Sequence, residues 1–234
     1  MEKKMDLMEV VFILDRSGSM SGLEGDTIGG FNSTLEKQKK ESDNVIWSTV
    51  LFDDRHEVIH DRVPIAKVEK LTENEYWVRG CTALLDAVGR AIHHIGNVHK
   101  YARPEDVPEK TMFVITTDGM ENASREYTYA AIKKMIESRK EKDGWEFVFL
   151  GANIDAVDVA GRMGIESSRA ATFINDGIGI EKNYRAVGKI MSRYHGMSAP
   201  MASGGGMDAV FEEELCEVRE DHAKRSKGIF GFRR

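Results

Sequence analysis

Several features that mark special classes of protein are rare or missing in this sequence. Only two cysteines occur among its 234 residues, Cys81 and Cys216, which argues against a disulfide-stabilised secreted scaffold. No apolar run approaches the roughly 20 residues needed to cross a bilayer, and no apolar signal segment precedes the first predicted strand. The net charge of −6 provides no basic surplus of the kind that nucleic-acid binding needs. We therefore expect a cytoplasmic protein with neither a membrane segment nor a nucleic-acid partner.

The sequence does contain an ordinary globular composition and regularly alternating secondary-structure patterns. Hydrophobic residues make up 41% and charged residues 31%, which is typical of a soluble globular protein. This length accommodates one α/β domain together with an extension. Strands are predicted at Val10–Leu14, Val45–Phe52, His56–Val63, Lys110–Thr117, Trp145–Leu150 and Ala170–Ile174. Helices are predicted at Thr27–Glu41, Ala83–His99, Tyr127–Lys142, Gly179–Tyr194 and in a short segment from Asp155 to Met163.

This order of elements predicts an α/β fold in which a doubly wound, Rossmann-like sheet is covered by helices on both faces. The short turn Asp53–Arg55 joins the second and third strands, and strands joined by so short a turn are antiparallel. We therefore expect a mostly parallel central sheet with one antiparallel edge strand. Asp53 and Asp54 are assigned to the formation of this turn, and an approach to the metal edge is the alternative for them.

The stretch Glu9–Ser21 carries the strongest functional signal. Its apolar strand ends abruptly at Asp15, and Ser17 and Ser19 follow at alternating positions, with Gly18 between them allowing a tight bend. Oxygen donors at the carboxyl end of a buried strand lie where open α/β sheets hold their ligands. Carboxylate and hydroxyl oxygens suit a hard divalent cation such as Mg²⁺, Mn²⁺ or Ca²⁺. On this stretch alone, an ordinary Ser/Gly loop with an aspartate that caps the next helix is an equal alternative.

Two later segments strengthen the metal hypothesis. The tripeptide Gly80 to Thr82 precedes an amphipathic helix, and Asp118 and Gly119 follow the end of another buried strand. In this order the three pieces closely resemble the von Willebrand factor type A (VWA) domain over about residues 6–175. That family holds a cation at its metal-ion-dependent adhesion site (MIDAS), and the resemblance assigns the ligand positions to Asp15, Ser17, Ser19, Thr82 and Asp118. Arg16 is a minor departure from the family pattern, and strand alternation points it away from the metal.

The resemblance implies a protein-binding module in which Mg²⁺, or alternatively Mn²⁺ or Ca²⁺, receives an Asp or Glu side chain from a partner protein. The intracellular bacterial members that this chain resembles often work beside ATPase chaperones or signalling components, so we expect a partner of that kind. A Mg²⁺-dependent phosphohydrolase and a scaffold with a purely structural metal are the alternatives. We do not expect an enzyme, because Ser17 stands where such phosphohydrolases carry an aspartate and no Ser–His–Asp or Cys–His arrangement is visible.

The chain divides into three expected parts. Residues 1–195 form the VWA-like domain, which a helix at about residues 179–194 closes, as the resemblance implies. Residues 196–207 have the composition of a flexible Gly/Ser linker. Residues 208–234 form a C-terminal tail with a short amphipathic helix and a basic end. The acidic segment Glu212–Glu214 in this tail is an alternative, intramolecular ligand for the metal.

Other chemistry-bearing residues receive structural assignments. A solvated helix face is expected to carry the three histidines His93, His94 and His99, since adjacent helix positions do not face one another. Cys81 is expected to be a packed thiol, because its neighbours provide no basic activator. Two alternatives stay open for Glu121 and Asn122, which follow Asp118: they support the metal loops, or they cap the next helix.

Overall fold

The computed structural model describes residues 6–198 and 205–231, with side chains described as far as Ser226. Its strands form one sheet in the order β3-β2-β1-β4-β5-β6. The strands are β1 (Met8–Asp15), β2 (Val45–Phe52), β3 (His56–Pro64), β4 (Lys110–Thr117), β5 (Glu146–Ala152) and β6 (Ala170–Phe173). β2 and β3 pair antiparallel, whereas every other neighbouring pair is parallel. The predicted fold class, including its antiparallel edge strand, is confirmed.

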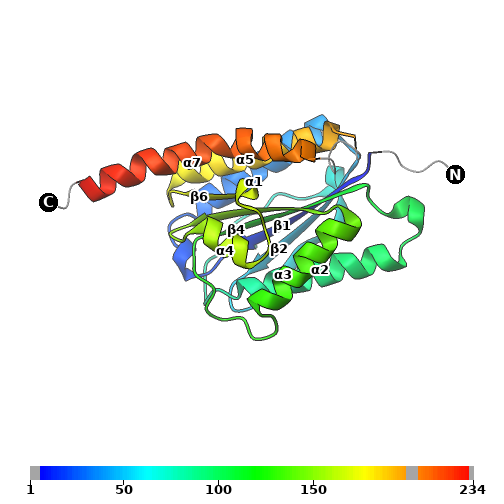
Figure 1. The fold of residues 1–234 in the computed structure, drawn as a ribbon, viewed down its shortest axis with the longest axis horizontal. Helices are drawn as coiled ribbons and strands as arrows, with labels where there is room; N and C mark the ends of the chain where they lie inside the picture. Colours follow the sequence, from blue (N-terminus) through cyan, green and yellow to red (C-terminus); the bar gives the residue numbers. More distant parts are fainter. Residues whose placement is uncertain (1–5, 199–204, 232–234) are drawn as a thin grey trace.

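Helices cover both faces of the sheet, as the sequence predicts (Figure 1). One face carries α1 (Glu24–Glu41), α5 (Gly177–Gly196) and α7 (Met207–Gly231), and the other carries α2 (Leu84–Tyr101), α3 (Tyr129–Asp143) and α4 (Ala156–Arg162). The alternation of β1 supplies both layers, because Val10 and Phe12 pack into the first core and Val11 and Ile13 into the second. β1 is therefore buried on both faces, and its last residue, Asp15, stands at the carboxyl edge of the sheet.

The tail helix α7 is part of the packed fold. It lies along α5 and β6, and its buried side chains join the core of that face. These side chains are Met207, Val210, Phe211, Leu215 and Val218. The helix begins one residue before the predicted tail and continues to Gly231, so it is longer than the short helix that we expected. Of the predicted linker, residues 199–204 lie outside the described part of the chain.

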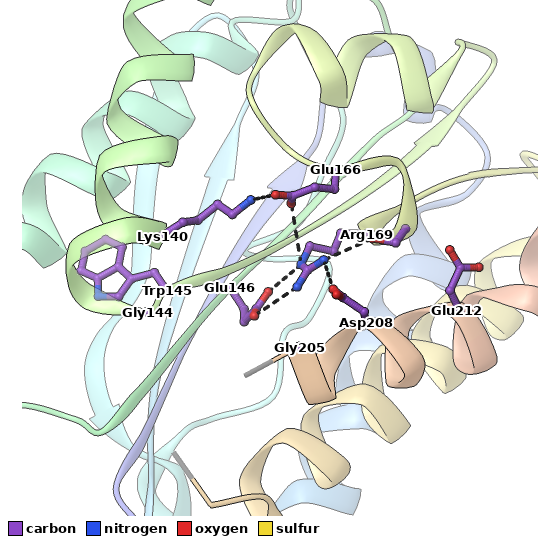
Figure 2. Close-up of a pocket in the computed structure, with 10 residues that line it drawn as sticks. Lys140, Gly144, Trp145, Glu146, Glu166, Arg169, Gly205, Asp208 and Glu212 are labelled. Carbon is purple, nitrogen blue, oxygen red and sulfur yellow. Dashed lines mark hydrogen bonds and ion pairs between the residues drawn. The ribbon is translucent and has the colours of Figure 1, made fainter. Parts of the chain in front are cut away.

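An ion-pair cluster fixes the first turn of α7 against the amino ends of β5 and β6. Arg169, directly before β6, donates to Glu146 at 2.7 Å and to Asp208 at 2.7 Å. Its guanidinium also lies over the ring of Phe211, 4.9 Å from the centroid. Figure 2 shows Arg169 between Glu146 and Asp208, in a pocket to which Lys140 and Glu166 also contribute. Three elements thus meet on one guanidinium, which sets the direction in which α7 leaves this edge.

The direction of α7 also determines where the acidic segment Glu212–Glu214 lies. Arg193, near the end of α5, pairs with Glu213 at 2.5 Å and with Glu214 at 3.1 Å. The following His195 reaches the carbonyl of Asp6, just before β1 begins. These carboxylates therefore lie toward the amino edge of the sheet, opposite the end of β1 that carries Asp15. The expectation that this segment occupies the metal position is wrong for this structure. Among the described residues, no helix is both long and apolar enough to span a membrane.

Candidate metal centre

Asp15 is the anchor of the predicted site. It is almost fully buried, and its Oδ1 accepts the backbone N–H of Ser17 at 2.6 Å. Its Oδ2 accepts the hydroxyl of Thr117 at 2.5 Å, which ties the end of β1 to the end of the neighbouring β4. The backbone carbonyl of Asp15 accepts the hydroxyl of Tyr76 at 2.6 Å. Contacts from three separate segments therefore fix the position and orientation of this carboxylate.

Three hydroxyls converge beside this carboxylate. Ser17 Oγ lies 3.0 Å from Ser19 Oγ and 3.1 Å from Thr82 Oγ1. Gly119 faces the same hydroxyls, because a Cβ added there would lie 2.8 Å from Thr82 Oγ1 and 3.0 Å from Ser19 Oγ. The absence of a side chain at this glycine leaves the space in front of the hydroxyls open. Ser17 and Thr82 are buried whereas Ser19 is exposed, so solvent reaches the group from one side.

Asp118 brings the second carboxylate to the group. Its Oδ2 accepts a hydrogen bond from the side-chain amide of Asn175 at 2.6 Å. A hydrogen bond with Ser19 lowers the pKa of this carboxyl group. Its other oxygen, Oδ1, is buried without a hydrogen-bond partner in the described structure. The structure thus brings the five residues predicted from the sequence into one group: Asp15, Ser17, Ser19, Thr82 and Asp118.

Within residues 6–198 and 205–226, no lysine or arginine side chain pairs with either carboxylate of this group. Burial raises the pKa of Asp15 to about 6, against hydrogen bonds from Thr117 and Ser17 that lower it, and the charge of Asp118 raises it further. Burial also raises the pKa of Asp118. Two buried carboxylates that repel each other, one of them with an orphaned oxygen, are what a bound cation would satisfy. The oxygen-only donor set fits Mg²⁺, Mn²⁺ or Ca²⁺. The described residues contain no cluster of three or more His, Cys, Asp or Glu, so the hydroxyls are essential to any such site.

Arg16 and Asp53 form a buried ion pair, here called the hub, behind the loops that carry the predicted ligands. Arg16 Nε lies 3.0 Å, and Arg79 Nε 2.6 Å, from the same oxygen of Asp53. Arg16 also reaches Glu57 on β3 at 2.7 Å, and its carbonyl accepts the backbone N–H of Arg79 at 2.9 Å. The prediction that Arg16 points away from the centre is therefore confirmed. The assignment of Asp53 to a turn is incomplete, because it accepts the N–H of Arg55 and also joins two loops that carry predicted ligands.

The segment after Asp118 supports the loop of Thr82. The side-chain oxygen of Asn122 accepts the N–H of Thr82 at 2.9 Å, and a carboxylate oxygen of Glu121 accepts the N–H of Leu85 at 2.9 Å. Since Leu85 lies in the first turn of α2, Glu121 satisfies a free helix N–H while it holds the loop before that helix. Of the two open alternatives, support of the loops is the one observed, and the helix that benefits is α2, which precedes these residues in the chain.

Other residues near the centre were missed or misassigned. Thr117 could have been found from its position beside Asp118 at a strand end, whereas nothing in the sequence singled out Asn175. Cys81 is exposed, so its assignment as a packed thiol is wrong. His99 is also misassigned: its Nε2 lies 2.5 Å from the buried carboxylate of Glu9, although the other two histidines of that helix are exposed as predicted.

Comparisons with known proteins bear on the fold. No protein-family model and no curated protein matches the sequence. A point mutant of the PilB minor pilin from Streptococcus sanguinis aligns with a TM-score of 0.57 at 12% identity, over 83% of this chain and 62% of that one. Proximal thread matrix protein 1 from the mussel byssus gives a TM-score of 0.52 at 15% identity, over 80% of this chain and 46% of that one.

A third structure carries the family name in its description. It is a von Willebrand factor type A protein from Catenulispora acidiphila, with a TM-score of 0.51 at 14% identity, over 77% of this chain and 41% of that one. The chain thus spans less than two thirds of the length of each of these proteins. At such low identities the likeness concerns the fold alone. The chain has a VWA-like α/β fold.

Proposed function

We propose that this chain is a metal-dependent protein-interaction module. Its centre would hold Mg²⁺, or alternatively Mn²⁺ or Ca²⁺, through Asp15, Ser17, Ser19, Thr82 and Asp118, and would bind an Asp or Glu side chain of a partner protein. One observation carries the proposal: two buried carboxylates with raised pKa values, one of them with an oxygen left unpaired, share a group with three hydroxyls.

The donor set explains why such a site would bind an anion. Three of its five donors are neutral hydroxyls, so a divalent cation there keeps part of its positive charge. The exposed side at Ser19 leaves access for a further ligand. A carboxylate is a ligand that hard cations prefer, and its charge would be matched by the charge the hydroxyls leave uncompensated. An ATPase chaperone or a signalling component is the kind of partner we propose.

Binding is favoured over catalysis by what surrounds the group. In the described structure, the side-chain hydrogen bonds of the five residues go to hydroxyls, amides and one another, and none goes to a histidine or lysine. Asp15 and Asp118 are assigned to the metal itself, so a hydrolase would need a further base or carboxylate nucleophile beside them. Ser17 occupies the position where the alternative phosphohydrolase would carry its second aspartate. We therefore propose no enzymatic activity.

Calorimetric titration with MgCl₂ tests the metal site. Asp15→Ala and Asp118→Ala should each abolish the binding heat while circular dichroism keeps the signature of the fold, because both residues lie at the sheet edge. Asp158→Ala is a matched control, since this exposed aspartate lies on α4 outside the group. Wild-type binding heat in either site variant would refute the metal assignment.

A second experiment separates partner binding from a purely structural metal. The full chain is used as bait with MgCl₂ or with EDTA, and the proteins retained in each condition are compared. A specific partner should be retained only with the metal and lost with Ser17→Ala/Ser19→Ala. It should also be lost when one acidic residue of that partner is replaced by its amide. A partner that binds equally well in EDTA would contradict the proposal.

A further inference from the structure

A groove lies between α2 and α3, which pack side by side on the face of the sheet opposite α5 and α7 (Figure 1). It contains a hollow of about 560 Å³ between residues 92–97 of α2 and residues 131–142 of α3, here called the basic groove. A second hollow of about 510 Å³ adjoins it beside Trp145, and both are lined by Asn97 and Arg139. None of the five candidate metal ligands lines either hollow, so the groove is a separate surface.

The floor of the basic groove is apolar. Ala131 and Met135, one turn apart on α3, line it from one side, and Ile92 of α2 lines it from the other. The side chains that α3 buries against the sheet are Ile132 and Ile136. Ala131 is exposed and Met135 is half-buried, so the packing of α3 on the sheet leaves part of this apolar surface uncovered.

The rim of the groove is positively charged. Lys134 and Lys142 line it and are exposed, and no acidic residue lines it. The adjacent Lys133, which lies outside the groove, pairs with Glu137. Among the residues that the structure describes, by contrast, no carboxylate pairs with Lys134 or Lys142. In a chain with a net charge of −6, these two lysines give the groove a local positive potential.

Arg139 fixes the shape of the groove. Its guanidinium lies over the ring of Trp145, 4.8 Å from the centroid, and pairs with Asp143 at 2.8 Å. A Cβ atom at Gly96 of α2 would collide with this guanidinium, so the glycine allows the arginine to reach from α3 to α2. The arginine thus holds the two helices at a fixed separation, and the groove is preformed.

We propose that the basic groove binds an acidic amphipathic helix of a partner protein. One apolar ridge of that helix packs on Ala131, Met135 and Ile92, as in the packing of a helix into a groove. Asp or Glu side chains beside the ridge face Lys134 and Lys142. The stretch of α3 from residue 131 to residue 142 is about 17 Å long, which matches about three turns of a bound helix.

The depth at which charged and apolar groups lie argues for this occupant. Ile92 is 1% exposed, whereas the lysines of the rim are open to solvent. A nucleic acid would pair its phosphates with the lysines but would leave the apolar floor uncovered. A membrane surface is too broad to enter a hollow between two helices. A partner helix presents a narrow apolar ridge with acidic flanks, which complements both the floor and the rim.

A designed peptide provides the probe. It is a fluorescein-labelled, hydrocarbon-stapled helix with leucines along one face and glutamates on the others, and the full chain is titrated into it in EDTA. Fluorescence anisotropy should show saturable binding. Replacing the leucines with serine, or the glutamates with lysine, should each weaken the affinity at least about tenfold. Equal binding of the serine peptide would show attraction by charge alone and overturn the proposal.

Variants of the chain connect the binding to the groove. Lys134→Glu/Lys142→Glu should weaken the affinity for the peptide at least about tenfold. Lys40→Glu/Lys67→Glu is the matched control and should keep it, because these lysines are exposed outside the groove and the net charge changes equally. Each pair contains one lysine in the last turn of a helix, so both variants should unfold at the same temperature. Equal loss of binding in both would overturn the assignment to the groove.

Other occupants give different results. Tighter binding of a single-stranded oligonucleotide or of phosphatidylglycerol vesicles, lost in Lys134→Glu/Lys142→Glu, would assign the groove to a polyanion or a membrane and overturn the proposed partner. Dimers of the chain that the same variant abolishes would assign it to a second copy and also overturn it. Because these titrations are made in EDTA, failure of the groove leaves the metal-dependent function untouched. A protein retained in EDTA and released by this variant is bound through the groove.

Discussion

The buried carboxylate of Asp15 should destabilise the metal-free protein at neutral pH. Burial raises its pKa from 3.8 to about 6, so the folded chain favours the protonated form. For a group with a raised pKa in the folded state, the stabilisation is fully present below pH 3.8 and is lost as the pH rises through about 6. A shift of this size corresponds to about 3 kcal/mol of the free energy of unfolding at pH 7.

Replacing Asp15 with asparagine removes this cost. The amide keeps an oxygen for the N–H of Ser17, and its NH₂ can donate to the Thr117 hydroxyl, which lies 3.2 Å from the carbonyl of Gly119 and can donate there instead. In the absence of metal we therefore expect Asp15→Asn to raise the free energy of unfolding at pH 7 by about 1–3 kcal/mol. The gain should vanish as the pH falls below 4, where the wild-type carboxyl is protonated in both states.

Urea unfolding at several pH values between 4 and 7 measures this difference. The wild type and Asp15→Asn are compared first in EDTA and then in MgCl₂, with Asp158→Asn as the exposed control. In MgCl₂ the wild type and the control should gain stability whereas Asp15→Asn should not, because ion binding stabilises the folded state alone. Metal affinity of the wild type should also fall about tenfold per pH unit below about pH 6, since the ligand must be deprotonated.

Two results would refute the reasoning. The first is an Asp15→Asn variant that, in EDTA at pH 7, is no more stable than the wild type, which would show that the carboxylate is adequately solvated or paired. The second is a stability difference that does not change with pH, because a packing effect of the amide would persist where the titration has ended. Either result would remove the electrostatic argument for a cation at this position.

Three further predictions concern other parts of the structure. Gly119→Ala should lose Mg²⁺ binding in calorimetry while the chain stays folded, because its methyl group would lie 2.8 Å from Thr82 Oγ1; retained binding would show that the hydroxyls do not face the ion. Asp53→Asn should lower the free energy of unfolding in urea by about 3 kcal/mol, since it leaves two arginines without their shared buried carboxylate, and an unchanged midpoint would contradict the hub. Leu215→Ala should cost about 2–5 kcal/mol, whereas Cys216→Ala on the exposed face of the same helix should cost almost nothing; equal effects would show that α7 is not docked.

The sheet and the grouping of the five candidate residues could be predicted because both depend on simple regularities. The bounds of β2 and β4 agree with the prediction to the residue, since all but one residue of each strand is buried and polar residues follow its end. Asp15 ends β1 and Asp118 directly follows β4; these two strands lie side by side, and parallel neighbours bring their carboxyl ends to one edge. The residues that follow such ends in the sequence are therefore also neighbours in space.

The rest depended on pairings that no periodicity encodes. His99 lies at a helical position that could be solvated, but Glu9 is buried at the start of β1 and takes Arg62 at 2.6 Å together with this histidine. A helix pattern identifies an apolar face but not the surface that covers it. The apolar face of α7 was therefore visible in the sequence, whereas its docking on α5 and β6 was not. Asn175 was missed for the same reason, because its partner comes from a distant loop.

The position of the Arg16 side chain determines which carboxylates at this edge of the sheet are neutralised. It lies between Asp15 and Ser17 in the chain, yet its guanidinium turns to Asp53, whose pKa is held below its usual range although burial alone would raise it. On the other side of the same loop, no arginine or lysine from the described residues pairs with Asp15 or Asp118, and burial raises the pKa values of both. Arg16 thus neutralises Asp53 and does not pair with Asp15 or Asp118. If this edge served only to stabilise the loop, Arg16 could have paired with Asp15 and Asp118 instead. Its pairing with Asp53 leaves these two carboxylates without a protein cation, which supports the proposal that a metal ion from solution binds them.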